Sequence, residues 1–81
     1  MSGELLKFKG RLEEARLLRK ELHMKIDGQV KAMRENLDPF EDVADLPADI
    51  IAQQARELAQ LRVNYIEVSD KIRAIEKALG R

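Results

Sequence analysis

The sequence contains no cysteine and only one histidine, His23, so two common ways of stabilising a small domain are missing. Without cysteine there is no disulfide bond and no thiolate metal site. A single histidine cannot by itself build a conventional zinc site. A chain of 81 residues buries only a modest core. We therefore expect one domain over residues 1–81 whose stability depends on close helix packing, on oligomerisation or on both.

Aromatic residues are also scarce, and the charges of the chain cancel. Aromatic residues make up 4% of the sequence and charged residues 37%, which is typical of long helices and coiled coils rather than of strands. The formal net charge is +0, which disfavours general binding to nucleic acid or to a membrane surface. The sequence also lacks an apolar run near the roughly 20 residues of a membrane span. It does not begin with the pattern of a secretory signal, so we expect a cytoplasmic protein.

Apolar residues recur at steps of three or four through the first part of the chain, which is the pattern of one face of a helix. The series is Leu5, Phe8, Leu12, Ala15, Leu18, Leu22, Ile26, Val30, Met33 and Leu37. Gly28 interrupts the series, but Ile26 and Val30 keep their phase on either side of it. This predicts one continuous helix over about 3–36, with a hinge at Gly28 as the alternative.

Two prolines separate this helix from a second one. Pro39 cannot continue the first helix, and Asp38, Pro39 and Glu41 together form a helix-start signal. We therefore expect a short helical turn at about 39–44 within a connection over 37–46.

The segment from Asp45 to Asp49, which contains Pro47, repeats the helix-start signal and predicts a second helix over about 47–79. Its apolar series is Ile51, Ala55, Leu58, Leu61, Tyr65, Val68, Ile72, Ile75 and Leu79. From Leu58 onward the steps alternate between three and four, as heptads require.

The two apolar series match when the helices are paired antiparallel. Leu12 then meets Ile72 and Leu22 meets Leu61, and the residue numbers of every pair add up to 83, 84 or 85. A single register therefore serves both helices along their whole length, as a hairpin with a short loop requires. The fold class predicted is all-α, a long antiparallel helical hairpin with coiled-coil-like packing.

We call the line of paired apolar residues between the two helices the seam. Further apolar residues lie beside it at helical spacing, and they make the apolar face as wide as that of a helix in a bundle. We expect these residues to flank the seam and to form the contact of a homodimeric four-helix bundle. They are Leu6, Leu17, Met24, Ala59, Val63 and Ile66.

The distribution of charge favours an antiparallel arrangement of the two copies. The segment 38–49 contains five acids and no base, namely Asp38, Glu41, Asp42, Asp45 and Asp49. The segments before and after it are net positive, with basic residues near both termini. A twofold dimer with its hairpins turned end for end would place each acidic loop near the basic end of the other copy.

No group of residues predicts chemistry. His23 and Asp27 lie one helical turn apart, but a third metal ligand is missing from the pattern. Catalytic carboxylates need a cleft that shifts their pKa, which a two-helix rod does not offer. The basic residues between positions 7 and 20 are interleaved with acids, and Tyr65 is expected in the core rather than on a stacking surface. We therefore predict no catalytic residue, no metal and no cofactor, and not an enzyme.

These observations favour a structural or adaptor protein that acts through coiled-coil protein–protein contact and self-association. The partner expected is a second copy of the chain or another protein, with neither nucleic acid nor membrane. The alternative is a small dimeric nucleic-acid-binding or regulatory protein. Its outline would be ROP-like, but a shared outline does not transfer function.

Overall fold

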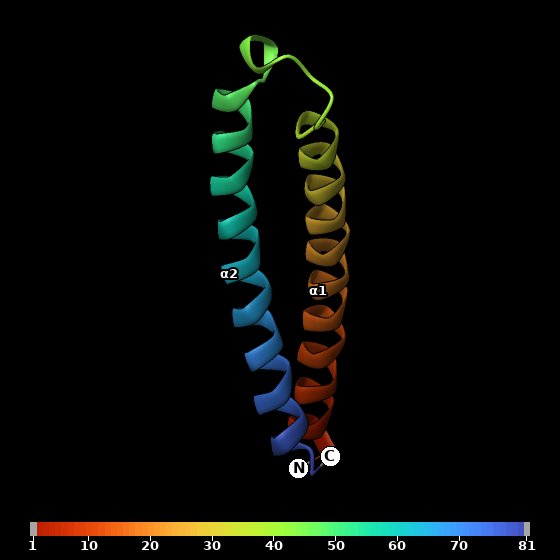
Figure 1. Cartoon of the computed structure of the whole chain (residues 1–81). Coiled ribbons are helices and arrows are strands. Elements are labelled where there is room, and N and C mark those ends of the chain that lie inside the picture. Colours follow the sequence, from red (N-terminus) through yellow and green to blue (C-terminus); the bar gives the residue numbers. More distant parts are fainter. Residues whose placement is uncertain (1, 81) are drawn as a thin grey trace.

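The chain folds into two long antiparallel helices joined by a short connection (Figure 1). The computed structural model describes residues 2–80, and for Ser2 the backbone only. The elements are α1 (Ser2–Asn36), a 3₁₀ helix η1 (Val43–Asp45) and α2 (Ala48–Ala78). The bounds of α1 and α2 differ by no more than one residue from those expected. This confirms the all-α antiparallel hairpin.

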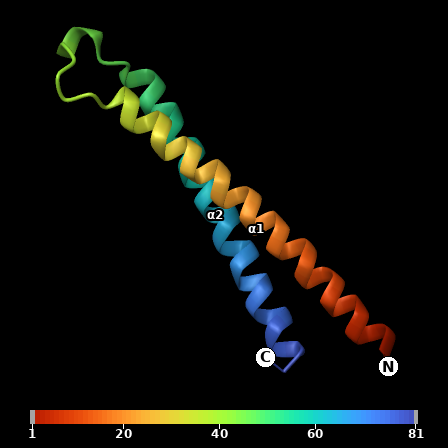
Figure 2. The ribbon, with the colours of Figure 1, turned by 90° about the vertical axis from the view of Figure 1, so that its right-hand side faces the viewer.

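The hairpin is a narrow rod. The Cα atoms extend over 64 × 16 × 14 Å. Views from two sides show that α1 and α2 lie side by side along the rod and cross at a shallow angle (Figures 1 and 2). The connection lies at one end of the rod, and the start of α1 and the end of α2 lie at the other (Figure 1).

Helix α1 continues through Gly28 without a break. An ion pair between the Lys31 ammonium and the Asp27 carboxylate, 2.9 Å long, spans the glycine on the helix surface. The phase that Ile26 and Val30 keep across Gly28 therefore predicted a continuous helix correctly. In α1 as described there is no hinge at Gly28, which was the alternative.

The short helical turn lies within the predicted connection over 37–46, but it begins later than expected. It was expected at 39–44 with Asp38 as its cap, whereas the structure has η1 at Val43–Asp45, capped by Asp42. The Oδ1 atom of Asp38 accepts a hydrogen bond from the Phe40 N–H at 2.9 Å, two residues along the chain. Such a local turn competes with helix capping, and here it redirects the chain before Asp42 caps η1.

The start of α2 also differs from the expected cap. Asp45 belongs to η1, and its N–H donates to the Asp42 carbonyl at 2.9 Å. Pro47 occupies the N-cap position without a side-chain hydrogen bond, and its carbonyl accepts from the Ile51 N–H at 3.0 Å. Because η1 uses Asp45, the second helix begins with Asp49 as the acid of its first turn.

The core lies in the half of the rod next to the termini. Its buried cluster contains Leu12, Ala15, Ile72 and Ile75, against which Phe8, Val68 and Leu79 pack. Leu12 and Ile72, which the register pairs, are each 1% exposed. In the other half, Gln29 Nε2 donates to the Gln54 carbonyl at 3.0 Å, and these residue numbers also fit the predicted register.

Several residues of the expected seam are less enclosed than predicted, among them Leu5, Leu18 and Leu61. Leu5 is 52% exposed because it lies near the open end of the rod, and Leu18 is 46% exposed at the edge of the seam. Leu61, expected in the core beside Leu22, is only partly buried. It lies toward the loop from the buried cluster.

Candidate interaction face

The apolar seam is closed in the terminal half of the rod and open in the loop half. Among residues 2–80, no side chain after Leu22 in α1 or before Ile72 in α2 is buried. The seam residues between these limits remain partly exposed. We call six of them the open seam: Ile26, Val30, Met33, Ile51, Leu58 and Leu61.

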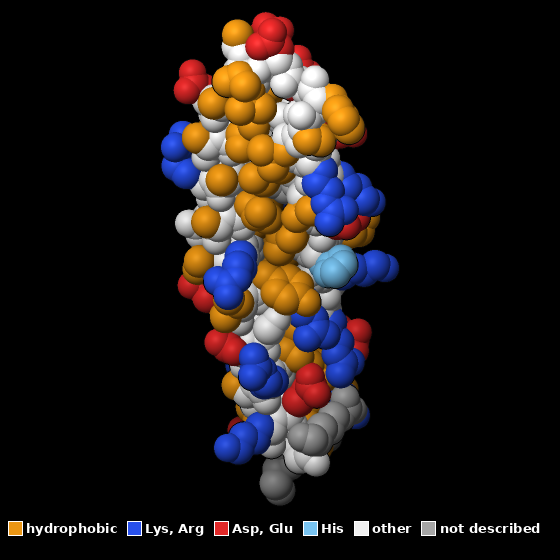
Figure 3. Space-filling model, viewed as in Figure 1, with side chains coloured by type: hydrophobic (Ala, Val, Ile, Leu, Met, Phe, Trp, Pro, Cys, Tyr) orange, Lys and Arg blue, Asp and Glu red, His pale blue; other side chains and the backbone are white. Residues whose placement is uncertain are grey.

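The surface view shows the consequence of this opening. Hydrophobic side chains form a continuous band between the two helices, from the level of the histidine to the loop (Figure 3). Exposed apolar side chains extend the band at the loop end, where Leu37 is 52% exposed and Ile50 is 55% exposed. A contiguous apolar strip on a soluble surface is typical of a site that another molecule covers.

Polar side chains help to hold the helices together in this half. Gln29 Nε2 also donates to Glu57 Oε2 at 3.1 Å, and Asn36 Nδ2 donates to Gln54 Oε1 at 3.0 Å. These amide contacts tie α1 to α2 where apolar packing is incomplete. The loop half therefore keeps the hairpin register without closing its apolar seam.

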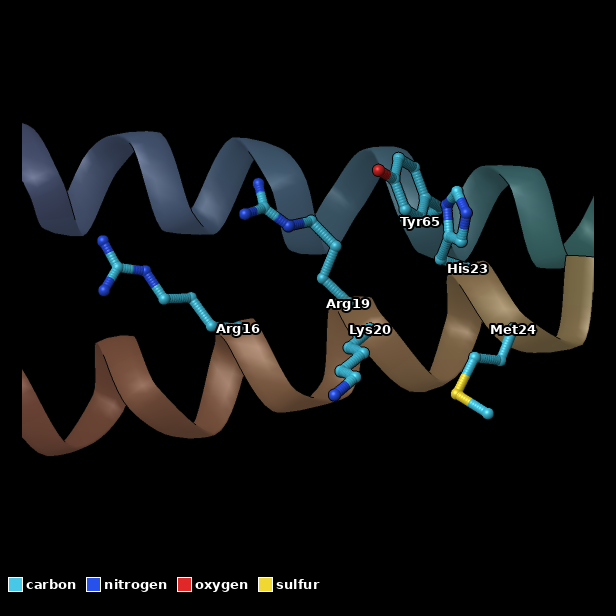
Figure 4. Close-up of a pocket in the computed structure, with 6 residues that line it drawn as sticks. All are labelled: Arg16, Arg19, Lys20, His23, Met24 and Tyr65. Carbon is cyan, nitrogen blue, oxygen red and sulfur yellow. The ribbon is translucent and has the colours of Figure 1, made fainter.

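An open pocket lies at the terminal end of the open seam, near the middle of the rod. It has a volume of about 450 Å³. Its lining residues are Arg16, Arg19, Lys20, His23, Met24 and Tyr65 (Figure 4). Five of them come from α1 at spacings of one, three or four residues, which places their side chains on neighbouring parts of one helix side. We call this the cationic pocket.

Tyr65 is the contribution of α2 to the cationic pocket. Its ring lies beside that of His23, with the centroids 6.4 Å apart and the planes tilted by 50°. Arg19 extends toward α2, whereas Lys20 and Met24 point away from it (Figure 4). Tyr65 was expected in the seam with its hydroxyl reaching the edge, and its side chain is partly buried at this pocket. The crossing of the helices brings His23 over the Tyr65 ring, and the heptad pattern carries no information about that contact.

The charge of the cationic pocket is largely uncompensated. Arg16 Nη1 has a contact of 3.5 Å with Glu13 Oε1 on a neighbouring turn. Within the described residues 2–80, Arg19 and Lys20 form no ion pair with an acid. The pocket can therefore bind an anionic group, with an apolar strip beginning directly beside it.

His23 and Asp27, considered from their spacing as two metal ligands, are engaged differently. The Lys31 ammonium hydrogen-bonds the Asp27 carboxylate and lowers the pKa of Asp27 below its usual value. Across residues 2–80 the structure contains no group of three or more His, Asp or Glu residues placed to hold a metal ion.

The six residues predicted to flank the dimer are all exposed on the rod. Met24 lines the cationic pocket, and the other five do not. Leu17 lies two residues after the buried Ala15, about 200° around the helix, and so faces away from α2. Leu6 is 67% exposed and Ile66 is 39% exposed.

The other end of the open seam is acidic. The five acids of the segment 38–49 surround the connection at the tip of the rod, and all are exposed. Asp38 and Asp42 use one carboxylate oxygen each to bind backbone N–H groups within the connection. Over the described residues, none of the five forms an ion pair with a base. We call this group the acidic tip.

Comparison with known proteins adds no relative. No family model, no curated protein and no solved structure matches the chain. Within residues 2–80, neither long helix has an apolar stretch sufficient to cross a membrane.

Proposed function

We propose that the chain is a non-enzymatic structural or adaptor protein that works through protein–protein contact and self-association. The observation that supports this proposal is the open seam. Val30, Met33 and Leu58 of the open seam are partly exposed, and hydrophobic side chains form one band along this half of the rod (Figure 3). Covering such a band with apolar side chains stabilises an assembly by about 25 cal/mol per Å² removed from water.

The small size of the buried cluster supports the same proposal. Five residues of the described chain are buried, and all of them lie in the terminal half or at its border. Neither a disulfide nor a cluster of metal ligands within residues 2–80 compensates for so small a core. Association through the loop half would extend the core over the whole rod, as in a four-helix bundle.

A variant at the open seam tests the proposal. Ala55 is exposed and belongs to the open half of the seam, so Ala55→Glu keeps helix propensity while it places a charge on the contact surface. We expect it to weaken self-association at least tenfold in analytical ultracentrifugation. Ala74→Glu, an exposed alanine of the terminal half, is the matched control. Equal association of both variants and the parent protein would contradict the use of this face.

The cationic pocket favours a second candidate function, binding of nucleic acid by a dimer. Three cationic side chains lie beside the rings of His23 and Tyr65, a combination that can hold phosphate and stack a base. Binding of this kind falls steeply with salt. Filter binding of RNA and DNA at low and moderate salt separates the two candidates, and an absence of salt-sensitive retention would eliminate the second.

A further inference from the structure

We infer that the molecule covering the open seam is a second copy of this chain, turned end for end and shifted so that only the two loop halves overlap. In this arrangement the acidic tip of each copy docks on the cationic pocket of the other. The inference rests on the proposed self-association and specifies its partner, its register and its charged contacts.

The extent of the apolar surface sets the overlap. The open seam begins at the cationic pocket and ends at the connection (Figure 3). On the terminal side of the pocket, the seam is already closed by Leu12, Ala15, Ile72 and Ile75. A partner therefore gains apolar contact by covering the loop half and gains little by extending over the terminal half.

The charges at the two ends of the seam make it complementary to itself. One end has three cationic side chains and His23, and the other has five acids without a base. A twofold axis perpendicular to the rod exchanges the two ends of the surface through which it passes. With the axis at the middle of the open seam, near the level of Val30 and Ala55, both contacts join opposite charges.

A full-length overlap of the two rods would pair each acidic tip with the basic terminal end of the other copy, but it would also bring like charges together at its middle. The rod is 64 Å long, so its middle lies about 32 Å from either end, near the level of His23 at a rise of about 1.5 Å per residue. A twofold axis there would bring the two cationic pockets face to face. Arg19 and Lys20 have no acid paired with them among the described residues, so the pockets would repel each other. The shifted register removes this repulsion.

Reversal of single charges tests the register. We expect Arg19→Glu to weaken the dimer about tenfold at low salt, because two symmetric contacts change from attraction to repulsion. Glu41 forms no side-chain hydrogen bond within residues 2–80, so Glu41→Arg alters the acidic tip without removing a cap. It should weaken the dimer similarly, and the double variant should recover most of the loss. Lys77→Glu, at the terminal end, should change the dissociation constant less than twofold.

Cysteine cross-linking gives a second measurement that does not depend on charge. The native chain has no cysteine, so a single introduced thiol reports only its own neighbourhood in the dimer. Ala55→Cys lies near the proposed axis and should form a disulfide-linked dimer under mild oxidation. Lys20→Cys, near the axis of a full-length overlap, should not.

The outcomes separate the register from the function. A dimer that is weakened by Lys77→Glu as much as by Arg19→Glu, without recovery in the double variant, would overturn the shifted register while leaving self-association in place. Efficient cross-linking through Lys20→Cys would overturn it as well. A parent protein that stays monomeric at every concentration would overturn the proposed function, and this inference with it.

Discussion

Leu12 and Ile72 are the two large side chains that the structure encloses almost completely, each at 1% exposure. The register pairs them, and both belong to the buried cluster with Ala15 and Ile75. Their periodicity and the register between the helices predicted this burial. Leu61 has the same periodicity but stays half-buried, because burial also depends on how closely the helices approach at that level. The local pattern contains no information about that distance.

At this scale we predict that Leu12→Ala destabilises the hairpin by about 2 to 5 kcal/mol, because it removes buried methyl groups and leaves a cavity. Leu17→Ala is the matched control, since Leu17 is 59% exposed, and its effect should stay within about 0.5 kcal/mol. Urea unfolding followed by circular dichroism measures both. Similar midpoints for the two variants would mean that Leu12 does not occupy the core.

At the scale of the elements, the helices follow from their apolar repeats, whereas the connection does not follow from its capping signals. A helix start can be capped by the side chain of Asp38, Asp42 or Asp45. The sequence pattern predicted that Asp38 caps the short helical turn. The structure uses Asp38 for a local turn and Asp42 for η1. These alternatives differ by about one hydrogen bond, too little for the residue types to decide.

Gly28 is a position in α1 where a substitution should stabilise the helix. It lies in an unbroken helix, and a Cβ atom added there would meet nothing within 4 Å. Gly28→Ala should therefore raise the free energy of unfolding by about 1 kcal/mol through the helix propensity of alanine. Gly80→Ala should have the opposite sign, because Gly80 has a φ of 77° that alanine adopts with strain. Thermal unfolding of both variants at one concentration checks the contrast, and a loss of stability in Gly28→Ala would indicate that α1 bends there.

At the scale of the whole molecule, the sequence predicted the hairpin and its register because two independent apolar series had to match over their full length. It did not predict that half of the seam stays open, or that Tyr65 and His23 meet beside three cationic residues. Both features depend on the crossing of two helices along a rod 64 Å long. They are also the features on which the proposed function rests, because they join an apolar strip to two groups of opposite charge.

We propose that a partner covers the open seam and that a second copy of the chain is sufficient to cover it. Sedimentation equilibrium of the parent protein from micromolar to millimolar loading measures this self-association. Mass action requires the weight-average mass to rise with concentration toward twice the 9.3 kDa of one chain. A single species at 9.3 kDa over the whole range would contradict the account.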